Sequence, residues 1–236
     1  MENKTAKYVK YAIGEIVLVV VGILIALQLN TWNTQRIQNN ELKDTCERML
    51  QEIASTKKWV AGKSNFIDSV VVSSNKRSLY LMQLKDPDSI RQIYNSLEGL
   101  SKVISVANDM PTTSEFLNDR NISELKNVRL KEHLLQIKQL LKFGAVVEGY
   151  ANTQLSGIIE PFVVKNLNYA KMARDKDMVE INSPTDYSFF FNNLELENLI
   201  NLKLETDHSK IDYLLTFNAV LDRTENEIKN ELQKYQ

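Results

Sequence analysis

The sequence contains few residues that break helices, cross-link chains or bind metals. Glycine occurs 7 times and proline 4 times in 236 residues, and chains this poor in both are usually helical. The single cysteine excludes an intrachain disulfide and a cysteine-based metal cluster. With only 2 histidines and no glycine-rich phosphate loop, the sequence disfavours zinc enzymes, Rossmann enzymes and P-loop enzymes.

Neither sign of charge is in excess. The 29 Lys and Arg residues are balanced by 30 Asp and Glu, which gives a net charge of -1 at pH 7. No global basic field is therefore present to recruit nucleic acid, and we expect no nucleic-acid partner. The length suits one domain, or a small domain with an anchor.

One long hydrophobic run lies near the N-terminus. Twelve consecutive residues carry no polar side chain, and Tyr8, Tyr11 and Trp32 flank the run. A helix from Tyr11 to Trp32 is about 33 Å long at about 1.5 Å per residue, close to the ~30 Å hydrocarbon core of a bilayer. Aromatic side chains at both ends, together with Lys10, are typical of membrane anchors. We predict a transmembrane helix over residues 9–31, with the lipid bilayer as its partner.

Two other interpretations of the run stay open. A cleaved signal peptide would use Lys4, Lys7 and Lys10 as its basic region, but small residues are missing where a cleavage site should follow. A buried helix of a soluble protein is the third interpretation, since twelve fully apolar residues are short for a span. The flanking Tyr, Trp and Lys side chains favour the uncleaved anchor.

Lysines precede the hydrophobic run and are absent directly after it, where Arg36 is the first charged residue. The positive-inside rule therefore predicts a short cytoplasmic tail over residues 1–8 and a periplasmic domain over residues 32–236. The predicted location is the inner (cytoplasmic) membrane, crossed once.

Glu15 lies inside the predicted span, and an ionisable residue at membrane depth is by default expected to have a functional role. Glu15, Val19, Gly22 and Ala26 share one helix face, and the small pair Gly22 and Ala26 allows another helix to approach closely. One hypothesis is that a protein partner or a second copy packs on this face. The alternative is a plain anchor in which Glu15 reaches the lipid headgroups.

A heptad pattern follows the span. Apolar or small side chains recur at spacings of 4 and 3 at Leu42, Cys46, Met49, Ile53, Thr56 and Val60. The pattern extends through Ile67, Val70 and Leu81, so we predict a stalk helix over residues 32–85. Packing within the chain's own bundle is favoured, and self-association through the stalk is the alternative.

Helical spacing and breakers divide the rest of the chain. Pro161 is expected to kink one of the predicted helices. No segment alternates with period two over a sustained stretch, so the predicted fold is all-α, a transmembrane helix that continues into an elongated extracytoplasmic helical bundle. The predicted segments after the stalk are a helix over 87–108, a short helix over 112–120, a kinked helix over 128–170, a loop over 171–192, a short helix over 193–204 and a C-terminal helix over 206–236.

Residues 7–33 read KYVKYAIGEIVLVVVGILIALQLNTWN. This string is similar to the start of an uncharacterised family of single-pass envelope proteins of Gram-negative bacteria, which opens with YAIGEIxLVxxGILIALQxNxWN. Residues 113–129 and 187–202 resemble later parts of the same family more weakly. The resemblance implies a membrane anchor and a helical outer domain, and it implies no activity or catalytic residue.

The sequence offers little catalytic chemistry. Glu205 and His208 have Glu-x-x-His spacing, but a di-iron bundle needs a second such motif, which His133 does not supply. Cys46 lies on the apolar seam, where a buried thiol is unreactive, and a cross-link between two chains is the alternative. The Gly-x-Ser-x-Gly elbow of hydrolases is missing. We predict no enzyme activity, no metal site and no cofactor.

An aromatic cluster lies near the start of the last predicted helices. It consists of Tyr187, Phe189, Phe190 and Phe191. One hypothesis is an exposed patch that binds a partner or a lipid surface. The other is that Phe189 or Phe190 fills the end of the bundle.

Two function classes follow from these features. The first is a membrane-anchored, non-enzymatic interaction or scaffold module, such as an accessory subunit of an envelope complex. The second is an extracytoplasmic ligand-sensing bundle that signals through a partner. The very short predicted cytoplasmic tail favours the first class.

Overall fold

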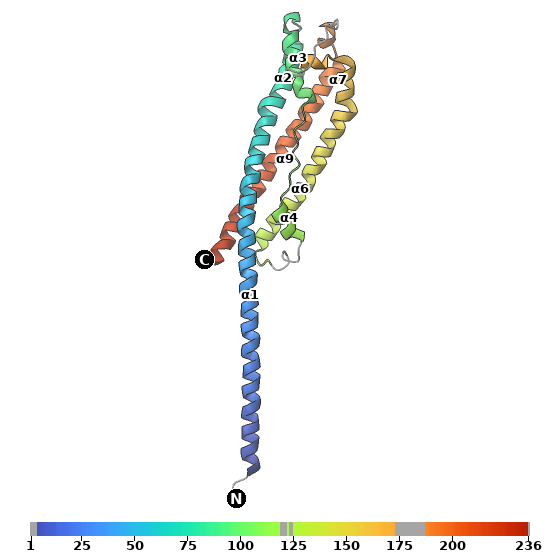
Figure 1. Ribbon diagram of the computed structural model, residues 1–236. Helices are drawn as coiled ribbons and strands as arrows, with labels where there is room; N and C mark the ends of the chain where they lie inside the picture. The colour runs from blue at the N-terminus through green and yellow to red at the C-terminus, as the bar shows by residue number, and fades with distance from the viewer. Residues whose placement is uncertain (1–3, 119–121, 123–124, 173–186, 236) are drawn as a thin grey trace.

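The computed structural model describes residues 4–118, 122, 125–172 and 187–235. These residues form an all-α chain of helices and helical turns joined by irregular segments, and no β-strand occurs among them. The molecule is a long rod with a bundle around its far half (Figure 1). The N-terminus lies at the free end of the rod, and the C-terminus lies beside the rod at the near end of the bundle.

The rod is one continuous helical path. α1 (Lys4–Phe66) passes through the π-helical turn η1 (Ile67–Val72) into α2 (Ser73–Leu84). Proline is absent from this stretch, so every residue keeps the N–H that the helical ladder needs. Lys85 ends the path in the left-handed conformation, with φ 52°.

The predicted heptad seam is the face of the rod that packs on the bundle. Its members from Cys46 to Val60 are all buried. The prediction is wrong at Val70, which is 37% exposed, whereas Val71 is fully buried. The cause is η1, because a π-helical turn holds an extra residue and shifts the buried face by one position.

After a 3-10 turn η2 (Pro87–Ser89), α3 (Ile90–Ser101) runs back along α2. Gly99 allows the two helices to touch, because a Cβ atom there would lie 3.0 Å from the carbonyl oxygen of Val71. The prediction of one helix over 87–108 is wrong at its C-terminal end, because α3 ends at Ser101.

Residues 102–110, named the strap, follow α3 without helical structure. Lys102 already has an extended backbone, with φ −82° and ψ 123°. The strap contains Val103, Ile104 and Val106, whose β-branched side chains favour extended over helical backbone. It runs as a thin trace from α3 toward the near end of the bundle (Figure 1).

The strap leads into α4 (Pro111–Asn118), which is tied to the rod. The carboxylate of Glu52 on α1 accepts hydrogen bonds from the backbone N–H of Thr112 at 2.8 Å and of Thr113 at 3.0 Å. It also accepts the Thr113 hydroxyl at 2.6 Å. One acidic side chain of the rod therefore satisfies donors that the first turn of a helix leaves free.

The helix predicted over 128–170 is divided. α6 (Val128–Gln154), capped by Asn127, leads through the π-helical turn η3 (Leu155–Ile159) into α7 (Glu160–Asn166). The predicted kink at Pro161 is thus taken up by the turn just before it, because proline cannot donate to the preceding helical turn. α8 (Tyr169–Met172) follows after a break.

The last helix, α9 (Leu194–Leu232), is a single element, so the predicted division into helices over 193–204 and 206–236 is wrong. Thr206 does not cap a new helix, because its hydroxyl donates back to the carbonyl of Leu202 at 3.0 Å. Asn193 caps the true start by accepting from the N–H of Leu196 at 3.0 Å. The predicted loop over 171–192 contains a 3-10 turn, η4 (Tyr187–Phe190), and η5 (Gln233–Tyr235) follows α9.

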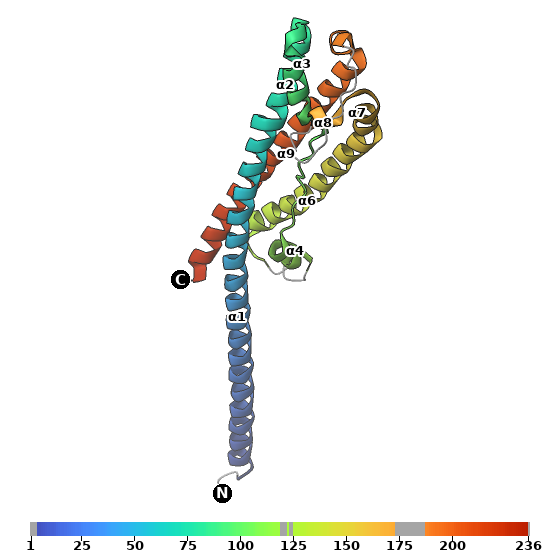
Figure 2. The same ribbon diagram turned by 45° about the horizontal axis from the view of Figure 1, so that its top comes forward.

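α9 is the central helix of the bundle, packed along α1 and along α6. The strap is hydrogen-bonded to both α6 and α9 and runs beside these helices in both views (Figures 1 and 2). The core runs along the buried face of α9, where Leu214, Phe217 and Leu221 have no exposed surface.

Candidate functional site

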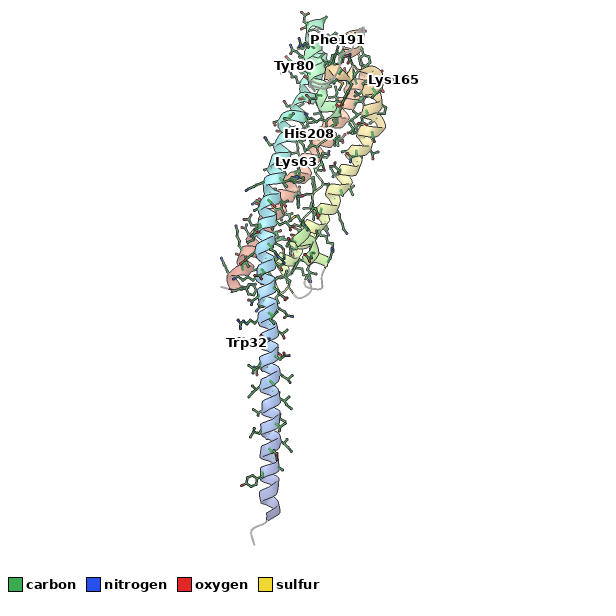
Figure 3. The ribbon with its side chains drawn as sticks, in the orientation of Figure 1. Trp32, Lys63, Tyr80, Lys165, Phe191 and His208 are labelled. Carbon is green, nitrogen blue, oxygen red and sulfur yellow. The ribbon has the colours of Figure 1, made fainter. Side chains whose placement is uncertain are left out.

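The apolar part of α1 stands free of the bundle. Every side chain from Tyr11 to Glu41 is exposed. Among the described residues, α1 is the one helix long and apolar enough to cross a membrane. Trp32 projects from the bare rod (Figure 3), and the Arg36 guanidinium lies 5.9 Å from its ring centroid in a cation–π contact.

The helix face of Glu15, Val19, Gly22 and Ala26 meets no other described part of the chain. All four residues are exposed, and a Cβ atom at Gly22 would find nothing within 4 Å. The fold therefore leaves this face open, as it does the rest of the span. The side chains of the predicted anchors Tyr8 and Lys10 lie outside the described residues.

The aromatic cluster lies mainly in the core, which favours the hypothesis that Phe189 or Phe190 fills the end of the bundle over an exposed partner patch. Phe190 is 1% exposed, and its ring meets that of Tyr94 edge-on at 5.0 Å. Phe189 stacks on Phe162 at 6.2 Å, and Phe191 is partly buried against the core. The 3-10 turn η4 sends successive side chains in different directions, so the three rings cannot share an outer face. The side chain of Tyr187 lies outside the described residues.

The residues weighed for catalysis lie apart from one another. Cys46 is fully buried, and burial, with the negative charges of Glu231 and Glu47, raises the pKa of its thiol to about 12. Glu205 and His208 are both exposed on α9 (His208 in Figure 3), and the His208 Nδ1 atom lies 2.7 Å from the Leu204 carbonyl oxygen. Within the described ranges, no three metal-type ligands gather.

A cluster of charged side chains lies inside the bundle instead. We call it the charge cluster, and it consists of Glu148 on α6 with Lys203, Asp207 and Lys210 on α9. Lys203 donates to both carboxylate oxygens of Asp207, and these two side chains are 6% and 3% exposed. Lys210 is 1% exposed. Two cations and two carboxylates therefore balance one another, with Lys203, Asp207 and Lys210 buried and Glu148 half-buried.

Burial works against the charges of this cluster. Burial raises the pKa of Asp207, while the nearby Lys203 and Lys210 cations act to lower it. Burial lowers the pKa of Lys210, and the negative charge of Glu148 opposes that shift. Opposite charges and hydrogen bonds nearby thus support the charged forms of Asp207 and Lys210 against desolvation.

The charge cluster holds the strap by its backbone. The Glu148 carboxylate accepts the N–H of Val106 at 2.8 Å. The Lys210 ammonium donates to the carbonyl of Ile104 at 2.9 Å. Sequence reasoning missed this cluster, although the placement of charged residues on the otherwise buried stripe of α9 was a visible signal.

Two buried polar atoms on α6 and α9, the helices that carry the charge cluster, have no hydrogen-bond partner. The Gln154 amide nitrogen donates to the Leu202 carbonyl at 3.3 Å, but its Oε1 atom is unpaired. The Tyr213 hydroxyl is also unpaired, and burial raises the pKa of this phenol to about 12. Buried polar atoms are usually bonded, so this part of the bundle has spare capacity for hydrogen bonds.

Comparisons of the chain with protein-family models, curated proteins and solved structures find no match. Function is therefore argued from the exposed apolar helix and from the charge cluster with its strap.

Proposed function

We propose that this protein is a membrane-anchored, non-enzymatic interaction module, an accessory subunit of an envelope complex. The observation that carries the proposal is the apolar part of α1, which is wholly exposed although the same helix forms a buried seam further along. Apolar surface of this extent is unfavourable in water and favourable in a bilayer. The N-terminal resemblance to single-pass envelope proteins supports the membrane anchor.

The proposed topology is a single crossing of the inner membrane, with the N-terminus in the cytoplasm and the bundle in the periplasm. Lysines before the span support this orientation. A C-terminal fusion to a reporter that is active only in the periplasm should be active, and a reporter active only in the cytoplasm should be silent. The opposite pattern would overturn both orientation and compartment. Replacing Lys4, Lys7 and Lys10 with Glu is the matched control, which should reduce the periplasmic signal.

The interaction role is tested by isolating the tagged full chain from membranes in mild detergent. Co-purifying proteins are identified by mass spectrometry and compared with a control chain whose residues 9–31 are replaced by an unrelated single span. A partner recovered with both chains would contact the bundle or stalk, and one lost with the control would contact the span. Reproducible recovery of neither a partner nor a second copy would contradict the proposal.

A second candidate function is ligand sensing by the bundle. The observation that favours it is the charge cluster, together with the unpaired Gln154 Oε1 atom on α6 and the unpaired Tyr213 hydroxyl on α9. A bound polar molecule would stabilise the folded state by mass action. A thermal-shift screen of the detergent-purified chain against small charged and zwitterionic molecules tests this candidate, with Lys210→Met as the variant that should lose the shift.

A further inference from the structure

The surface of α6 and α9 beneath the strap, which includes Glu148 and Lys210, is called the groove below. We propose that the groove is a binding site for an extended peptide segment of a partner protein, and that the strap occupies this site in the chain alone. The site would work by exchange, in which a partner segment replaces the strap. This inference rests on the proposed interaction role only in taking a protein as the partner, and it is independent of the membrane span.

The strap sits in the groove as a bound peptide would. Its burial alternates: Val106 and Met110 are fully buried, whereas Ser105, Ala107 and Asp109 are exposed. Among the described residues, no backbone–backbone hydrogen bond involves residues 103–109. The strap is therefore held by what lies beneath it rather than by secondary structure of its own.

The polar contacts recognise backbone atoms rather than a particular sequence. Glu148 accepts a backbone N–H and Lys210 donates to a backbone carbonyl, and both bonds are charge-assisted. Any extended segment offers the same two groups at the same spacing. Selectivity would come from the buried sites of Val106 and Met110, which require apolar side chains four positions apart. A fitting partner segment is extended, with apolar residues at those positions and polar residues between them.

Displacement of the strap is less costly than displacement of a helix. The Lys210 ammonium beneath it is buried, and a charge that is desolvated in the closed state regains hydration when the groove opens. This gain offsets part of the lost burial of Val106 and Met110. Because the strap is joined at both ends to helices of the same chain, its high effective concentration keeps the groove occupied until a competing segment is present.

The test measures binding of a fluorescent peptide with the sequence of residues 101–111 to the full chain in detergent, by anisotropy. In Val106→Asp, a buried acid disfavours the strap's own docking, so the peptide should bind at least about tenfold more tightly than to the parent chain. Ala107→Asp is the matched control, because Ala107 is exposed, and it should bind like the parent. Adding Lys210→Met to Val106→Asp should abolish the gain.

Equal binding by Val106→Asp and Ala107→Asp would overturn the proposal. Loss of helical circular dichroism in Val106→Asp would also overturn it, because the strap would then be an integral part of the core. Hydrogen exchange of the parent chain gives an independent measurement: the Val106 amide, which is bonded to Glu148, must exchange faster than the amides of α9 around Lys210. Exchange of both at one common rate would show that the strap opens only on global unfolding. None of these results bears on whether α1 spans a membrane or recruits a partner there.

Discussion

The buried ion pair of Lys203 and Asp207 leads to a quantitative prediction about stability. The two side chains are 6% and 3% exposed, so each charge has lost nearly all of its hydration. Removing one partner leaves the other buried and unpaired, which should lower the free energy of unfolding by about 3–5 kcal/mol in Lys203→Met or Asp207→Leu. At about 2–4 °C per kcal/mol for a chain of this size, the Tm should fall by about 6–20 °C.

The double variant Lys203→Met/Asp207→Leu should recover the loss. Apolar side chains of similar size avoid the desolvation cost of both ions, and such replacements range from neutral to about 1–4 kcal/mol stabilising. Glu148 and Lys210 then balance each other, so no net charge is left in the core. Thermal unfolding of the four chains in one detergent, followed by circular dichroism, completes the cycle. A double variant as unstable as the worse single variant would refute the reasoning.

Two comparisons sharpen this test. Lys229 forms an exposed ion pair with Glu225, so Lys229→Met should change the free energy of unfolding by no more than about 0.5 kcal/mol.

The pKa of Asp207 is raised by burial, so the folded state binds its proton more tightly than the unfolded state does. The ionised carboxyl therefore costs stability above that pKa, and the cost disappears as the pH falls through it. In Lys203→Met the pKa of Asp207 rises further, so the deficit of this variant should shrink on acidification, whereas that of Asp207→Leu should not.

Three further predictions concern other parts of the molecule. Gly144→Ala places a Cβ atom 2.7 Å from the ring Cζ of the buried Tyr213, so it should lower the free energy of unfolding by about 1–3 kcal/mol, measured by thermal unfolding. Gly149→Ala has open space around it and should instead raise the free energy of unfolding by about 0.5–1 kcal/mol. Equal effects of the two changes would contradict the close contact between Gly144 and Tyr213. Gly22→Leu should reduce recovery of an assembled complex from membranes, since close van der Waals packing is the main attraction between helices in lipid; Ile23→Leu lies off that face, and indistinguishable recovery would identify the span as an anchor alone. The lone cysteine, with its thiol pKa raised to about 12, should resist alkylation in the folded chain and react after denaturation, and fast native labelling would show that its site opens.

The all-α architecture could be predicted because helix formation depends mainly on local sequence. The scarcity of breakers and the heptad spacing from Cys46 to Val60 were enough to place the long rod and its buried seam. The same reasoning failed at Val70, because a π-helical turn leaves no separate mark in the hydrophobic pattern. It also divided α9 near Thr206, where the helix continues and the Thr206 hydroxyl donates to the Leu202 carbonyl.

The charge cluster and the strap could not be predicted, because their contacts join distant parts of the chain. Lys210 meets Ile104 across 106 positions of sequence, and Glu148 meets Val106 across 42. Ile104 also continues the helical spacing of α3, so the pattern there favoured helix over the extended strap. The β-branched side chains of the strap favour extended backbone, and the contacts with Glu148 and Lys210 add to that preference only in the folded chain.

The unbroken rod has a mechanical consequence. Between Trp32 and the first buried residue, Cys46, the chain offers neither proline nor glycine at which a helix would bend or swivel. Torque applied to the apolar end is therefore transmitted through the helix rather than absorbed in a joint. Because the buried face of α9 is packed on the same helix, a rotation of α1 about its own axis would turn the bundle as a unit. The orientation of the bundle therefore follows the orientation of α1, and a molecule bound to the apolar end of α1 would set it.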